Sequence, residues 1–114
     1  MRRILVVAAL LAAVGCGPES PEQKAQRAAK TCVDSTWAWT MSQRYVRNNL
    51  KSPSSAKFAA LPLRANLLSG CTHEVVGEFE AQNSFGAMIK QRFSAKMTYD
   101  PANNTWKGED LSIF

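Results

Sequence analysis

The stretch that decides the fold is HEVVGEFEAQNSFGAMIKQRFSAKMTY, His73 to Tyr99, in which apolar and polar residues alternate on both sides of Asn83–Gly86. Alternation with a period of two is typical of a strand with one buried face. Two such segments joined by a short segment that contains glycine predict an antiparallel hairpin. We expect Gly86 to take the left-handed position of a three-residue loop, because glycine adopts a positive φ at little cost.

The length of this loop decides which residues of the hairpin lie opposite one another. It places opposite charges across from each other on one face, in the pairs Glu80–Lys90, Glu78–Arg92 and Glu74–Lys96. The other face gathers the apolar side chains Phe79, Ile89, Phe93, Met97 and Tyr99. The turn and the pattern of the two faces therefore predict the same register.

A helical period precedes the strands. On a helix, one side carries the apolar and small residues Ala38, Trp39, Met41, Ser42, Tyr45, Val46 and Leu50. Pro53 ends this helix, because proline cannot continue the hydrogen-bond ladder. Upstream, Ser20 and Gln23 have the spacing of a capping box, and Thr31–Asp34 offers a second helix start. Either one long helix or two abutting helices fit Pro21–Leu50.

Weaker signals complete the sheet. Phe58–Leu68 is predicted to be an edge strand, because Pro62 lacks a backbone donor. Ser69-Gly70 predicts a turn, and Trp106–Phe114 is the last predicted strand. The predicted fold class is α+β, with an N-terminal helix or helix pair packed on a three- to four-stranded antiparallel meander. Residues 31–114 are expected to form this single helix-on-sheet domain.

The N-terminus has the pattern of a leader peptide. Arg2-Arg3 precedes the apolar run Ile4–Val14. A run of about eleven residues suits a signal peptide, whereas a membrane-spanning helix needs about 20. The run ends in LAAVGCG, Leu11–Gly17, where a cysteine follows a small residue. This ending resembles the lipobox of bacterial lipoproteins.

The lipobox resemblance implies a lipid on Cys16, which would anchor the protein to a membrane. It also implies that residues 1–15 are a cleaved leader and that residues 16–30 are a tether that runs into the helix. The implied location is the bacterial cell envelope, and Gly17 in place of an aspartate favours the outer membrane, facing the periplasm. The alternative is an ordinary secreted protein that is cut after Gly15, in which Cys16 is incidental.

Two motifs of the predicted domain resemble those of a small α+β domain found in many bacterial proteins, envelope lipoproteins among them. The first is LKSPS, Leu50–Ser54, at the end of the helix. The second is AQNSFG, Ala81–Gly86, at the tip of the hairpin. This resemblance implies the fold and carries no activity with it.

Charge and cysteine content bound the function. The formal charge of +5 falls to +3 without the two leader arginines. This excess is too small to indicate nucleic-acid binding. Once Cys16 is lipidated, Cys32 and Cys71 remain as an even pair, which predicts a disulfide in an oxidising compartment. Two free buried thiols are the alternative. A zinc site that adds His73 is a weak signal, because no ligand spacing supports it, and no cofactor is predicted.

The sequence contains no readable catalytic constellation. His73 is the only histidine, and no nucleophile motif surrounds it or any serine. The chain is therefore predicted to be non-enzymatic. Its candidate partner contacts are Trp37 with Arg44 on the helix, and Phe85 at the hairpin tip, because exposed aromatic and arginine residues are common binding hot spots. The alternative for Trp37 is packing against Pro21–Lys30 or a sheet edge.

These residues predict a lipid-anchored envelope protein that serves as a protein-binding or assembly accessory module. A periplasmic inhibitor or immunity protein against a hydrolase is the alternative. A small-ligand carrier is disfavoured, because a small sheet covered by one helix is expected to leave little room for a pocket of about 300 Å³.

Overall fold

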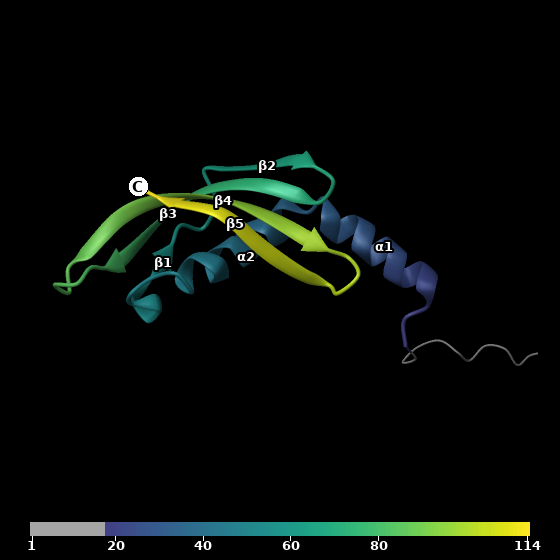
Figure 1. Ribbon diagram of the computed structural model, residues 1–114, viewed down its shortest axis with the longest axis horizontal. Helices are drawn as coiled ribbons and strands as arrows, with labels where there is room; N and C mark the ends of the chain where they lie inside the picture. Colours follow the sequence, from purple (N-terminus) through teal and green to yellow (C-terminus); the bar gives the residue numbers. More distant parts are fainter. Residues whose placement is uncertain (1–17) are drawn as a thin grey trace, which may run out of the picture.

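The computed structural model describes residues 18–114, so the predicted leader and the predicted lipidation site, Cys16, lie outside the described residues. Two helices precede a five-stranded antiparallel sheet, and the fold is α+β as predicted (Figure 1). The elements are α1 (Pro21–Cys32), α2 (Ser35–Arg47), a 3₁₀ turn (Pro53–Ser55), β1 (Lys57–Phe58), β2 (Arg64–Ser69), β3 (Thr72–Gln82), β4 (Met88–Asp100) and β5 (Thr105–Ile113).

The β3–β4 hairpin has the predicted register. The opposed pairs include Glu80↔Lys90, Glu78↔Arg92 and Glu74↔Lys96. Gly86 has a φ of 83°, and the side-chain oxygen of Asn83 accepts hydrogen bonds from the backbone N–H groups of Phe85 and Ala87. The loop is therefore held by a side chain that mimics a backbone turn, together with one residue in the left-handed region.

The charged face forms partly different ion pairs from those that the register predicts. Glu78 pairs with Arg92 at 3.2 Å, as expected. Glu74 pairs instead with Arg64 of β2 at 3.2 Å, and Lys96 lies 3.6 Å from Asp110 of β5. Each charged residue in the middle of a sheet has neighbours on two sides, so the hairpin alone does not decide its partner.

The sheet has five strands, so the prediction of three or four is wrong. The predicted edge strand Phe58–Leu68 divides into β1 and β2, which both pair with β3. Pro62 lies between them and cannot donate to the ladder. Phe58 and Arg64 are six residues apart, whereas their partners on β3, Phe79 and Val76, are only three residues apart. The edge chain therefore loops out between β1 and β2. The edge position itself is confirmed.

Helix α2 lies against one face of the sheet, and the core forms between them (Figure 1). The buried members of the core are Ala38, Trp39, Val46, Ala56, Val75, Phe79, Ala81, Phe93, Ala95 and Met97. Trp39 stacks on Phe93 with ring centroids 6.0 Å apart. Ile89 was expected in this core but is 40% exposed, because the hairpin continues past the end of the helical layer (Figure 1). The helix also ends at Arg47, earlier than the predicted Leu50.

The helical region is a pair of helices rather than one long helix. The capping box of Ser20 and Gln23 starts α1, as predicted. Asp34 starts α2, where its carboxylate accepts hydrogen bonds from the N–H groups of Thr36 and Trp37. Helix α1 contains no buried residue and projects from one end of the sheet (Figure 1). In residues 18–114, no helix has the length and apolar character needed to cross a membrane.

Candidate functional site

A surface groove of about 650 Å³ lies between the two helices and the β4–β5 hairpin. Its lining residues are Arg27, Thr31, Trp37, Met41, Arg44, Asn104, Thr105 and Trp106. Here it is called the Trp37 groove. It brings together Trp37 and Arg44, the two helix residues that the sequence predicts as partner contacts. It adds Arg27 of α1 and Trp106 of β5, which were not predicted from the sequence.

The groove exists because α1 does not lie on the sheet. The chain turns at Val33–Asp34, and the C-terminal end of α1 is attached to the strands. Two contacts hold that end. Cys32 and Cys71 come together in the geometry of a disulfide, with Cα atoms 4.6 Å apart, as predicted. In addition, the backbone carbonyl of Cys32 lies 2.9 Å from Nε2 of His73. The disulfide end of α1 therefore positions one wall of the groove.

The three residues that the sequence suggests as a weak zinc site are engaged with one another. The two cysteines are paired, and His73 is fully buried beside them. Because a carbonyl oxygen can only accept a hydrogen bond, Nε2 of His73 carries the proton in this contact. Nδ1 is left as a buried acceptor without a partner in the described part of the chain. In residues 18–114, no group of three His, Cys, Asp or Glu residues is placed to hold a metal ion.

The apolar part of the groove consists of Trp37, Met41 and Trp106. Trp37 is 49% exposed, so about half of its surface is free for contact. Trp106 is partly buried and is held from behind by Tyr99 and His73, with ring centroids 5.3 and 5.7 Å away. Trp106 is thus packed against its neighbours in the sheet, whereas Trp37 is the more exposed of the two tryptophans. An aromatic surface of this kind offers a large contact area with few rotatable bonds.

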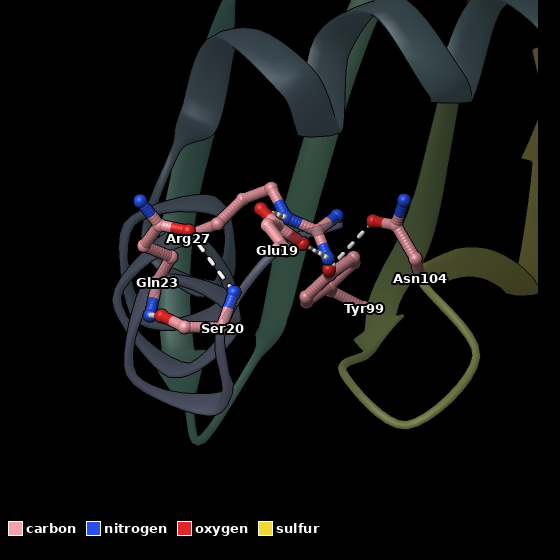
Figure 2. Close-up of polar contacts among 6 residues, drawn as sticks. All are labelled: Glu19, Ser20, Gln23, Arg27, Tyr99 and Asn104. Atoms are coloured by element: carbon pink, nitrogen blue, oxygen red, sulfur yellow. Dashed lines mark hydrogen bonds and ion pairs between the residues drawn. The ribbon is translucent and has the colours of Figure 1, made fainter. Parts of the chain in front are cut away.

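Positive groups and hydrogen-bond donors surround the apolar part. In residues 18–114, Arg44 is exposed and makes no ion pair. Arg27 binds Glu19 through two contacts of 3.0 Å, from Nε and from Nη2 (Figure 2). Lys30 lines an adjoining hollow of about 380 Å³ that shares Arg27 and Trp37 with the groove. The carboxylate of Asp34 in that hollow is used to cap α2.

The β4–β5 turn supplies the remaining edge. The hydroxyl of Tyr99 donates a hydrogen bond of 2.7 Å to the side-chain oxygen of Asn104 (Figure 2). The amide nitrogen of Asn104 is therefore the end that can donate to a partner. In the same turn, the side chain of Asn103 and the backbone N–H of Ala102 bond to Asp100 and lower its pKa below the usual 3.8.

Phe85, the third predicted partner contact, lies apart from this groove. It is 94% exposed at the tip of the β3–β4 hairpin. Figure 1 shows that tip at the opposite end of the molecule from α1. Phe85 therefore projects from the core, and the sequence-predicted contacts divide into two separate surfaces.

The size of the groove corrects one expectation. A small sheet covered by one helix was expected to leave little room for a pocket of about 300 Å³, but the Trp37 groove is about twice that size. The reason is the angle between the helices: α1 leaves the sheet instead of covering it. The lining residues carry guanidinium, hydroxyl, amide and aromatic groups, which suit binding.

Comparison of the chain with protein-family models, with curated proteins and with solved structures found no match. What the groove binds is therefore inferred from its own residues.

Proposed function

We propose that this chain is a lipid-anchored protein of the bacterial envelope that binds a protein partner through the Trp37 groove. The observation that supports binding is a half-exposed tryptophan, Trp37, that shares a groove of about 650 Å³ with Arg44, an arginine that makes no ion pair within residues 18–114. Tryptophan and arginine are the residues most enriched at binding hot spots.

The proposed location comes from the sequence. The apolar run before Cys16 and the small residue that precedes the cysteine support lipidation. The pairing of Cys32 with Cys71 agrees with an oxidising compartment such as the periplasm. A Cys16→Ser variant is expected to move from the membrane fraction to the soluble fraction, because stable anchoring requires the acyl chains.

The partner test is affinity capture from detergent-solubilised envelopes with the full-length lipidated chain, followed by mass spectrometry. Three baits are compared: the wild type, the Trp37→Ala/Arg44→Ala variant, and Phe85→Ala as the control that removes the other exposed aromatic. The proposal predicts one stoichiometric partner that the wild type and Phe85→Ala capture and the double variant loses.

The identity of that partner separates two versions of the proposal. A component of an envelope machine would make the chain an assembly accessory, and a hydrolase would make it an inhibitor or immunity protein. A partner lost only with Phe85→Ala would move the binding surface to the hairpin tip. Equal capture by all three baits would contradict binding through either surface.

A further inference from the structure

We infer that the Trp37 groove takes an acidic peptide segment that carries an aromatic side chain, and this inference rests on the proposed function as a protein-binding module. The ligand class follows from two features of the groove: an apolar floor and a rim of cations and donors. Each feature limits the chemistry of the occupant separately.

The floor selects a bulky apolar side chain. Trp37, Met41 and Trp106 line one hollow, and Trp106 is already packed against Tyr99. Aromatic rings gain from contact with other rings beyond the area that they bury. Methionine adapts its shape and makes favourable contacts with rings through its sulfur. An aromatic side chain of the partner therefore fits this floor better than a small or polar one.

The rim selects carboxylates beside that side chain. Arg44 has no acidic partner in the described chain, and Asn104 has an amide nitrogen left to donate. The nearby acidic groups of the chain are already used, since Glu19 binds Arg27 and Asp34 caps α2. The rim therefore offers donors and positive charge to a partner and few acceptors.

The pair of Glu19 and Arg27 shows the expected geometry within the chain itself. Both carboxylate oxygens of Glu19 reach one guanidinium, at 3.0 Å each (Figure 2). A carboxylate that meets a guanidinium in this two-point manner gains strength and a fixed orientation. Arg44 presents the same group without an occupant in residues 18–114. A carboxylate of the partner is the matching ligand.

An anionic membrane surface is the competing ligand for such a rim, because phosphate also binds arginine. A lipid headgroup would use the cations but would leave the apolar floor unfilled. A peptide uses both, because it places an aromatic side chain and its acidic neighbours a few ångströms apart. The combination of floor and rim thus favours the peptide.

The test is fluorescence anisotropy with the full-length lipidated chain in neutral detergent micelles. Three peptides with the same neutral label serve as probes: Gly-Asp-Glu-Phe-Glu-Asp-Gly, its counterpart with Lys and Arg in place of the acids, and its counterpart with Ala in place of Phe. The acidic Phe peptide is expected to bind at least about tenfold more tightly than either counterpart. Its binding is expected to weaken as salt rises, because the contacts at the rim are ionic.

Matched variants assign the binding to the groove. Arg44→Gln and Trp37→Ala are each expected to weaken binding of the acidic peptide by about tenfold. Lys57→Gln removes one positive charge from β1, far from the groove along the chain. It is expected to change the affinity for the acidic peptide by less than about twofold. Circular dichroism of each variant confirms the fold before titration.

Three outcomes would overturn the inference. The first is equal affinity for the acidic and basic peptides, and the second is binding of the acidic peptide that neither Arg44→Gln nor Trp37→Ala weakens. The third is displacement of the acidic peptide by phosphatidylglycerol in mixed micelles, where the phospholipid binds through Arg44 and Trp37. The capture experiment keeps the two proposals distinguishable. A partner lost with Trp37→Ala/Arg44→Ala but no preference for acidic peptides would overturn only the ligand class. A preference for acidic peptides without any captured partner would overturn only the accessory or inhibitor function.

Discussion

The disulfide is expected to stabilise the domain and also to hold α1 in place. Replacing both cysteines, Cys32→Ser/Cys71→Ser, opens a covalent loop with a sequence separation of 39. The loop-entropy relation for that length gives a loss of about 4 kcal/mol in the free energy of unfolding. A domain of this size has a free energy of unfolding of about 5–15 kcal/mol, so the variant is expected to remain folded but to be markedly less stable.

The loss should be measured by urea unfolding, followed by tryptophan fluorescence, in a form that begins at Pro18. Amide hydrogen exchange then tests the local effect, because α1 has no buried residue and its disulfide end is its main attachment. Relative to the wild type, the variant is expected to show a larger increase in exchange rate at the amides of α1 than at those of β3 and β4. Cys32→Ala/Cys71→Ala is the control for the serine hydroxyls. A loss below about 1 kcal/mol, or unchanged exchange in α1, would refute the reasoning.

Three further changes test individual packing and electrostatic contacts. Gly77→Ala places a Cβ against the ring of Trp39, and urea unfolding should show a loss of about 1–3 kcal/mol. Asp34→Ala removes the cap of α2 and should cost about 1 kcal/mol by the same assay. Asp100→Asn tests pH dependence: hydrogen bonds from Asn103 and Ala102 lower the pKa of the Asp100 carboxyl, so its contribution is present above pH 3.8 and is lost as the pH falls through the lower folded pKa. The stability gap between wild type and Asp100→Asn should therefore shrink as the pH falls below 3.8, and a gap that widens on acidification would contradict this assignment.

The hairpin could be predicted from the sequence because its determinants are local. Gly86 takes the left-handed position in the loop, and the alternation on both sides predicts the face of each strand residue in Thr72–Gln82 and Met88–Asp100. The helix pair was only partly predictable. Asp34 caps α2, which is a local signal, whereas the pairing of Cys32 with Cys71, 39 residues away, is a long-range contact that a local pattern does not place.

The groove could not be predicted, because it depends on the direction of α1. Trp37 and Arg44 were readable as residues on one face of a helix, two turns apart. Trp106 enters the site only because β5 pairs with β4 and places it opposite Tyr99. The strand alternation around Trp106 was the one signal that could have indicated a residue on the helix-covered face. Arg27 carries no comparable signal, since its role depends on the angle at Val33–Asp34.

The position of the groove along the chain also limits where its partner can lie. Only four residues lie between Cys16 and Pro21, the first residue of α1, and the five Cα–Cα steps from Cys16 to Pro21 span at most about 18 Å. Arg27 lies six residues further along the helix, or about 9 Å. A lipid on Cys16 would therefore keep the Trp37 groove within about 30 Å of the membrane surface. The partner that fits this geometry presents its acidic segment close to the membrane.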